Sequence, residues 1–259
     1  MARKQEIRLS LPGARIGAAD FSRARLEEAD FSSARIHGSS FEGAKITDAS
    51  FENADISAEI EGLRVNGVEV APLVEAELDR LLPERTKLRA SNPTGLAEAW
   101  EMVEGIWRGT AERARALPEP LLNQQVDEEW SYVETLRHMI FAIDSWLGRM
   151  IRQQDHPFHP FGIAGPWLQD PGGLGLNVEA SPSSSEVLEV FWERMAEVRA
   201  TIASVTPGEL ERVCEPPAVP GHPNRTEPVG QCLRVILKEA WLHSRYANRD
   251  LDLLSSGSS

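Results

Sequence analysis

The residues best suited to chemistry are two histidines and a glutamate that lie far apart in the sequence. The chain has six histidines, and only His138 and His243 stand in the middle of predicted helices. Glu239 precedes His243 by four residues, a spacing that places both side chains on one face of a helix. Two imidazoles and a carboxylate are a ligand set of catalytic zinc and non-haem iron sites, which keep a coordination position open. If their helices are neighbours, these three residues predict a metal site.

The same three residues also have an ordinary structural interpretation. His138 is then a hydrogen-bonded core residue, and Glu239 and His243 form a solvated pair on a helix surface. Because Glu-x-x-x-His occurs by chance in many helices, spacing alone leaves both interpretations open. The remaining histidines lie in a repeat or in proline-rich segments, where we expect hydrogen-bonding or solvent-facing roles. They are His37, His156, His159 and His222.

Four amphipathic helical patterns would position the candidate ligands. They are predicted over residues 92–117, 131–150, 183–205 and 228–254. Asn92-Pro93 fits a helix start, and serines followed three residues later by glutamate give capping boxes at the second and third helices. His138 falls in the second helix, and Glu239 with His243 in the fourth. The patterns predict an up-down four-helix bundle, a fold whose sites are built from facing helices.

Two connections between these helices are long and rich in proline and glycine, residues 153–182 and 206–227. Loops of this length in a compact domain are usually functional or disordered. The first contains too many large apolar residues for a solvated loop, namely Phe158, Phe161, Ile163 and Trp167. We therefore expect this segment to cover one mouth of the bundle.

A five-residue repeat occupies residues 12–56, reading PGARI GAADF SRARL EEADF SSARI HGSSF EGAKI TDASF ENADI. Neither a helix nor a strand keeps this period on one face. The repeat resembles the pentapeptide-repeat family, which implies a short right-handed quadrilateral β-helix. With four units per coil, Ile36 is expected between Ile16 and Ile56 in a dry ladder. We interpret residues 60–70 as a cap with an Asn66-Gly67 hairpin turn, and residues 71–90 as a short helix with a linker.

Two C-terminal stretches, WSYVETLRHMIFAIDSWLGRMI and QCLRVILKEAWLHSRYANRDLDLL, resemble the DinB-like (DinB/bacillithiol-transferase) superfamily. The resemblance implies a four-helix bundle that binds a divalent metal, most often zinc or nickel. It assigns the ligands to His138, Glu239 and His243, although many members have histidine where this chain has Glu239. Asp144 is a candidate for a supporting hydrogen bond to a ligand.

The expected organisation is α+β with several domains. Residues 1–60 form the repeat β-helix, 61–91 the cap and linker, 92–254 the bundle and 255–259 a disordered tail. The net charge is −13, and neither the repeat region nor the remainder is basic, which argues against nucleic-acid binding. There is no apolar run long enough for a membrane span and no secretory signal. The two cysteines, Cys214 and Cys232, are expected to be free thiols in a reducing cytoplasm.

Three functions remain open from the sequence. Some DinB-like relatives are transferases or isomerases that use bacillithiol, mycothiol or glutathione, so the resemblance implies a metal-dependent transfer of a low-molecular-weight thiol to a small electrophile. A metal-dependent hydrolase would need the same ligands and a bound water. A non-enzymatic assembly module is the third, since the chain has no P-loop, GxGxxG turn or Ser-His-Asp elbow. In each case the repeat is expected to be a scaffold or a dimerisation element.

Overall fold

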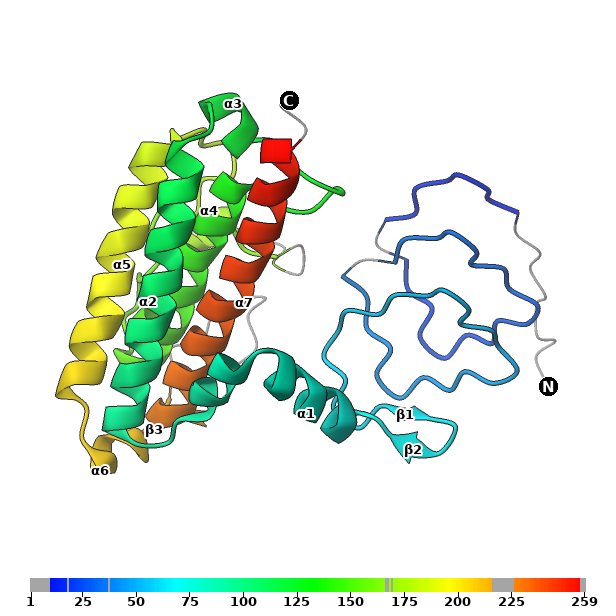
Figure 1. Cartoon of the computed structure of the whole chain (residues 1–259), viewed down its shortest axis with the longest axis horizontal. Coiled ribbons are helices and arrows are strands. Elements are labelled where there is room, and N and C mark those ends of the chain that lie inside the picture. The colour runs from blue at the N-terminus through cyan, green and yellow to red at the C-terminus, as the bar shows by residue number, and fades with distance from the viewer. Residues whose placement is uncertain are drawn as a thin grey trace. The chain divides into compact units, whose positions relative to one another are not determined.

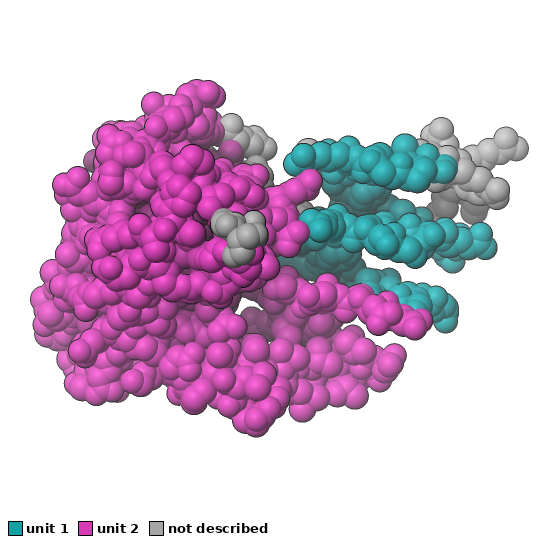
Figure 2. Space-filling view, turned by 45° about the horizontal axis from the view of Figure 1, so that its top comes forward, with its two compact units in different colours: residues 1–51 teal, residues 52–259 magenta. Residues whose placement is uncertain are grey.

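A computed structural model describes residues 10–17, 19–36, 38–165, 168, 170–215 and 226–256 (Figure 1). The chain divides into two compact units, Met1–Phe51 and Glu52–Ser259 (Figure 2). In the part of the chain that is described, no helix combines the length and the apolar character needed to cross a membrane.

The backbone of the repeat follows the predicted five-residue period. A left-handed φ recurs at every fifth described residue, and this series is Gly13, Arg23, Glu28, Ser33, Gly38, Gly43, Asp48 and Asn53. Described turn hydrogen bonds come at every tenth residue, where the backbone N–H groups of Ala14, Ala24, Ala34 and Ala44 donate to the carbonyl three residues earlier. The chain therefore turns once per repeat unit, as the sequence predicted.

The predicted dry ladder is wrong. Ile16, Ile36 and Ile56 are 58%, 54% and 61% exposed, and the described residues of 10–56 form no strand. The reason lies in the hydrogen bonds, because the described backbone bonds close turns within one coil. Strands pair about 4.8 Å apart, and without such pairing the apolar side chains of successive coils do not exclude water from one another. The described residues thus keep the five-residue period of the repeat, and they do not show a β-helix.

A hairpin follows the repeat, at the predicted place. Strand β1 (Arg64–Val65) pairs antiparallel with β2 (Val68–Glu69). Asn66 and Gly67 form the turn with φ values of 49° and 83°, the left-handed pair that a type I′ turn requires. The Asn66-Gly67 hairpin prediction is therefore confirmed.

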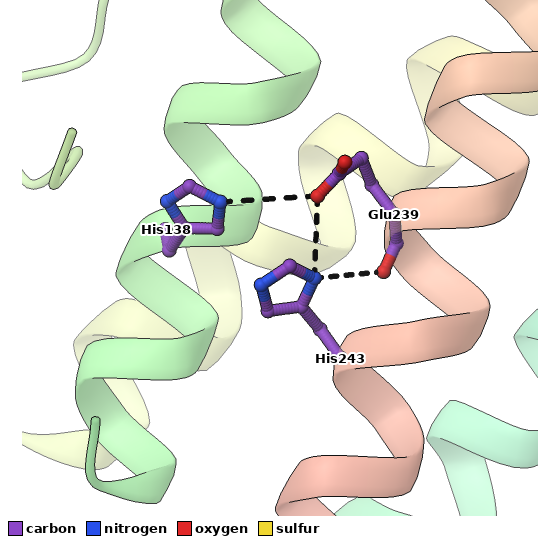
Figure 3. A group of neighbouring side chains, drawn as sticks. All are labelled: His138, Glu239 and His243. Atoms are coloured by element: carbon purple, nitrogen blue, oxygen red, sulfur yellow. Dashed lines mark hydrogen bonds and ion pairs between the residues drawn. The ribbon is translucent and has the colours of Figure 1, made fainter. Parts of the chain in front are cut away.

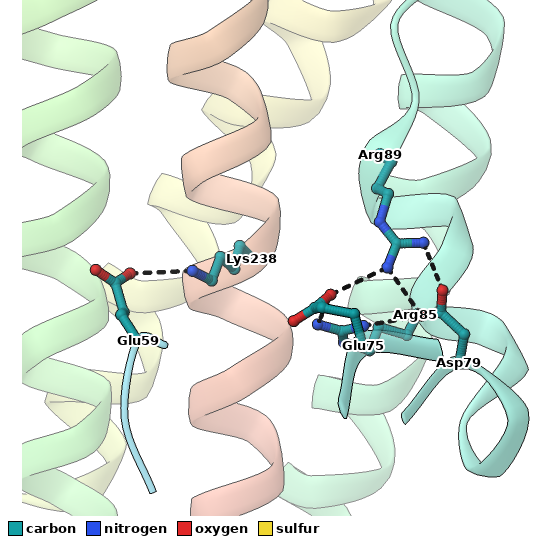
Figure 4. Close-up of polar contacts among 6 residues, drawn as sticks. All are labelled: Glu59, Glu75, Asp79, Arg85, Arg89 and Lys238. Atoms are coloured by element: carbon teal, nitrogen blue, oxygen red, sulfur yellow. Dashed lines mark hydrogen bonds and ion pairs between the residues drawn. The ribbon is translucent and has the colours of Figure 1, made fainter. Parts of the chain in front are cut away.

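The short predicted helix is also present, as α1 (Ala71–Leu81), and a 3-10 helix, η1 (Pro83–Arg89), follows it. Ion pairs join the two elements (Figure 4). The Arg85 guanidinium lies 2.6 Å from a Glu75 carboxylate oxygen and 2.8 Å from one of Asp79. Arg89 lies 2.7 Å from Asp79. Nearby, Lys238 pairs with Glu59 at 3.1 Å (Figure 4).

Four long helices form the bundle: α2 (Pro93–Arg115), α4 (Tyr132–Ile143), α5 (Ser184–Ser204) and α7 (Val229–Ser256). The predicted caps are confirmed. Asn92 accepts a hydrogen bond from the backbone of Gly95, and Ser131 and Ser183 each form a complete capping box. Helix α7 continues through the first two residues of the expected tail, and residues 257–259 lie outside the described part.

Short elements connect the long helices. They are α3 (Glu119–Leu122), the 3-10 turn η3 (Gly172–Leu174), α6 (Pro207–Leu210), and strands β3 (Val213–Cys214) and β4 (Glu227–Pro228), which pair with each other. Helix α4 continues without a break into a π-helix, η2 (Asp144–Ile151). Gly148 in η2 permits a close approach of the chain, since a Cβ there would lie 2.6 Å from the Cβ of Pro157.

The helices occupy the four corners of the bundle. Both α2 and α4 pack against α5 and against α7, so α2 and α4 lie diagonally opposite each other (Figure 1). The apolar stripes predicted for the helices face this centre, where Trp107, Leu136, Phe191 and Leu233 are fully buried. Trp107 also donates from its indole N–H to the carbonyl of Ala240, 2.9 Å away.

The predicted up-down order of the bundle is wrong in one respect, because α4 and α5 run in the same direction. Arg152, just after η2, pairs with Glu197 in the second half of α5, whereas Arg137 in the middle of α4 binds the carbonyl of Ala180, just before α5. The order is therefore up, down, down, up. Short loops force neighbouring helices to be antiparallel, but a long connection allows the chain to return along the bundle. We call residues 152–183 the crossover segment.

Candidate metal centre

The structure brings the three predicted ligands together (Figure 3). His138 projects from α4, and Glu239 and His243 project from the facing side of α7. One potential ligand atom from each lies within 4.8 Å of the other two. His138 Nε2 is 3.9 Å from a carboxylate oxygen of Glu239, and His243 Nδ1 is 3.4 Å from the same oxygen. The pairing of α4 with α7 thus provides the convergence that the spacing in the sequence required.

Both imidazoles are oriented by backbone carbonyl groups. Nδ1 of His138 lies 3.1 Å from the carbonyl oxygen of Ile163, and Nδ1 of His243 lies 2.9 Å from that of Glu239. Because a carbonyl oxygen can only accept, each Nδ1 must carry the proton in these bonds, and a neutral ring then has its lone pair on Nε2. A hydrogen bond from the far ring nitrogen is typical of histidines that bind metal.

The donor set fits a divalent ion. Two nitrogens and a carboxylate oxygen at about 2.1 Å from a tetrahedral zinc would be about 3.4 Å apart. The separation of 3.9 Å between His138 Nε2 and the Glu239 carboxylate is close to that value, and one potential ligand atom of each of the three residues lies within 4.8 Å of the other two. The side chains of His138, His243 and Glu239 retain 14%, 12% and 30% of their exposure. The two imidazoles are thus largely enclosed, while the Glu239 side chain is partly exposed.

Aromatic rings surround the two imidazoles. The ring centroid of Trp130 lies 4.3 Å from that of His138 and 6.3 Å from that of His243. Phe141 and Tyr246 add further contacts, with Phe141 6.2 Å from His138 and Tyr246 5.9 Å from His243. Trp130 could not be identified from the sequence. Its only signal was an aromatic residue directly before the capping serine of α4.

Electrostatics at the site combine burial with mutual contacts. Burial alone would raise the pKa of Glu239, but its hydrogen bond with His138 and the neighbouring positive charges lower that pKa overall. Burial and the charge of His138 lower the pKa of His243, against the opposing effect of Glu239. The lowered pKa of Glu239 favours its ionised carboxylate and the lowered pKa of His243 favours its neutral imidazole, the forms in which these two groups bind metal.

Asp144 points away from the candidate ligands. Its carboxylate accepts from the Arg194 guanidinium at 2.6 Å and from the backbone N–H of His159 at 2.8 Å. Burial raises its pKa to about 6, although Arg194 opposes that effect. Asp144 therefore joins α5 to the crossover segment, and the suggested supporting bond to a ligand is not formed.

The other histidines behave as expected where they are described. The Nδ1 atom of His159 accepts from the backbone N–H of Phe161 at 3.1 Å, and His156 is exposed. His37, His222 and Trp167 lie outside the described residues. The cysteines are free and buried.

The crossover segment covers the side of α4, so the predicted position at a mouth of the bundle is wrong. Phe158 stacks on Phe141 of α4 with centroids 5.4 Å apart, and Leu168 and Leu176 are buried in the same cluster. The return path explains this placement, because a segment that joins two parallel helices must run along the bundle. Through Ile163 the segment also supplies the carbonyl that binds His138.

Comparison with known proteins gives two matches along the chain. A family model described as the DinB superfamily matches residues 102–247, a range that includes all three candidate ligands. A model for pentapeptide repeats matches residues 21–59. No curated protein and no solved structure matched the chain.

Proposed function

Because the chain belongs to the DinB superfamily, we propose that His138, Glu239 and His243 bind a divalent metal ion, zinc or nickel, and that the protein transfers a low-molecular-weight thiol to a small electrophile. One observation carries the proposal: the imidazole of His138 on α4 and the carboxylate and imidazole of Glu239 and His243 on α7 converge within 4.8 Å. The backbone carbonyls that bind both Nδ1 atoms leave the Nε2 lone pairs for the metal.

The electrostatics of the site support the same proposal. Burial removes water from the Glu239 carboxylate, but its hydrogen bond with His138 and the neighbouring charges still lower its pKa overall. A lowered pKa keeps the carboxylate ionised, which is the form that binds a metal.

A bound divalent metal would lower the pKa of a thiol and hold the thiolate as a nucleophile. The thiol has to come from outside the protein. Cys214 and Cys232 are both completely buried, and burial raises the pKa of both thiols. Neither is therefore a nucleophile at neutral pH, which favours a thiol cosubstrate. Trp130 and Tyr246 provide aromatic surface at the site for an apolar electrophile.

A metal-dependent hydrolase is the second candidate. Two histidines and a glutamate are also the ligand set of zinc hydrolases, in which a bound water completes the coordination. The two reactions differ in the nucleophile, so they can be separated by supplying or omitting the thiol.

Metal binding is tested first. Metal-stripped protein is titrated with zinc and with nickel by calorimetry, alongside the His138→Ala/His243→Ala double variant. We expect one site in the wild type and its loss in the double variant. Equal affinity in both proteins would refute the assignment.

Activity is tested next on the zinc- and nickel-loaded proteins. Chlorodinitrobenzene with a panel of low-molecular-weight thiols tests transfer, and para-nitrophenyl acetate without thiol tests hydrolysis. Thiol-dependent turnover that disappears in the double variant supports the transferase. Ester turnover alone supports the hydrolase. A metal-loaded protein inert in both assays leaves the non-enzymatic assembly module.

A further inference from the structure

Arg137, the residue directly before His138, is buried in an unusual way. Its side chain is 7% exposed, and its partners among the described residues are backbone carbonyls of the crossover segment. Nε donates to Phe161 at 2.8 Å, Nη1 to Ala180 at 3.0 Å and Nη2 to Asn177 at 3.2 Å. One planar guanidinium thus joins three points of the segment, a geometry for which arginine is suited and lysine is not.

The backbone of Arg137 binds the same segment. Its carbonyl accepts from the N–H of Ile163 at 3.2 Å, and the carbonyl of Ile163 in turn accepts from Nδ1 of His138 at 3.1 Å. The N–H and C=O of one loop residue are therefore both bonded to consecutive residues of α4. The guanidinium bond to Phe161, two residues earlier, fixes the loop at that point.

We propose that Arg137 is a positioning residue that sets the tautomer and orientation of His138 through the crossover segment, an inference that rests on the proposed metal site. The Arg137 guanidinium binds the carbonyl of Phe161, and Phe161 is two residues before Ile163 in the segment. The Ile163 carbonyl then accepts the hydrogen bond that keeps the proton of His138 on Nδ1. The Nε2 atom then faces Glu239 and His243 with its lone pair.

The energetics agree with this role. A buried guanidinium without a carboxylate partner is costly, and burial lowers the pKa of Arg137, with only Glu134 opposing the effect. A neutral side chain could fill the same space at lower cost. Three charge-assisted hydrogen bonds offset part of that cost, and they hold in place a segment that has little regular structure of its own.

The test compares Arg137→Lys with the wild type and with Arg212→Lys. Arg212 is a matched control because it also donates to a backbone carbonyl beside the crossover segment, that of Ile151 at 3.0 Å, and to Glu209. Two readouts are used. Nitrogen-15 NMR of the imidazoles in metal-free protein reports the tautomer of His138, and competition with a chromophoric chelator reports zinc affinity.

We expect the metal-free wild type to show His138 with its proton on Nδ1. Arg137→Lys should give a mixture of tautomers and about tenfold weaker zinc binding, the lower end of the loss usual for such outer partners. Arg212→Lys should change neither. If Arg137→Lys does not fold, Arg137→Gln replaces it, because it removes the buried charge and keeps two donors.

The outcomes separate this inference from the proposed function. A wild type with the proton on Nε2 of His138 overturns the positioning role, and so does an Arg137 variant with unchanged tautomer and unchanged affinity. A wild type that binds no zinc, with a tautomer that still depends on Arg137, refutes the metal site and leaves the positioning role supported.

Discussion

At the scale of single residues, Glu239 is the most informative position of the site. The DinB resemblance places a histidine there in many relatives, while this chain has a carboxylate that lies 3.9 Å from His138 and 3.4 Å from His243. Glu239→Gln should weaken zinc binding, since an amide is a poorer ligand than a carboxylate. Glu239→His should retain binding because it supplies another nitrogen ligand. Calorimetric titration measures both, and tight binding by the Gln variant would contradict a role for Glu239 as ligand.

Asp144 should make stability depend on pH. Burial raises its pKa from 3.8 to about 6 in the folded state, so between these values the folded protein holds a proton that the unfolded chain has released. Stability therefore falls as pH rises through this window. The shift of roughly two pKa units corresponds to at most about 3 kcal/mol.

The measurement is the free energy of unfolding at about pH 4 and at about pH 7 for the wild type and Asp144→Asn. We expect the wild type to lose stability relative to the variant as the pH rises. Loss of the Arg194 contact in the variant gives an offset that does not change with pH, so only the difference in slope counts. Parallel pH curves would show that Asp144 titrates normally.

The three candidate ligands could be predicted from sequence because helical spacing and residue type define them. Their supporting groups could not. The carbonyls of Ile163 and Glu239 belong to the backbone, which has no residue signature. Trp130 lies two residues before α4 and contacts His138, a contact that no spacing rule predicts from the sequence. The role of Arg137 likewise depends on where the crossover segment runs.

At the scale of elements, the helix starts were predictable because their capping residues act locally. Asn92, Ser131 and Ser183 bind the first turns of their own helices. The π-helix η2 was not predictable, since the apolar stripe through Leu147 and Met150 continues that of α4. The direction of α5 could not be predicted for a different reason. A long connection permits either direction, and the packing of the helices determines which one forms.

Gly148 offers a test of the contact between η2 and the crossover segment. Gly148→Ala would place a methyl group 2.6 Å from the Cβ of Pro157, and such overpacking typically costs about 1–3 kcal/mol. Gly105→Ala in α2 is the matched control, because nothing lies within 4 Å of its new Cβ. There we expect a gain of roughly 0.5–1 kcal/mol from helix propensity. Urea unfolding measures both, and an unchanged Gly148→Ala midpoint would show that Pro157 moves away freely.

At the scale of the whole molecule, the metal should couple to folding. A ligand that binds only the folded protein stabilises it, by about 2.7 kcal/mol at a free concentration 100 times its Kd. We therefore expect zinc to raise the melting temperature of the wild type and to leave that of the His138→Ala/His243→Ala variant unchanged. Calorimetric scans with and without zinc measure the difference. An equal increase in both proteins would indicate binding elsewhere.

The diagonal arrangement of α2 and α4 determines when the growing chain can become compact. During synthesis α2 and α4 appear first, but each packs against α5 and α7. Their apolar stripes therefore stay exposed until α5 and α7 have been synthesised. Contacts between distant segments generally slow folding. A chain that stops before α7 leaves the apolar faces of α2 and α4 incompletely covered, and it lacks Glu239 and His243. Addition of α7 is thus the step at which the bundle gains both a closed core and the complete set of candidate ligands.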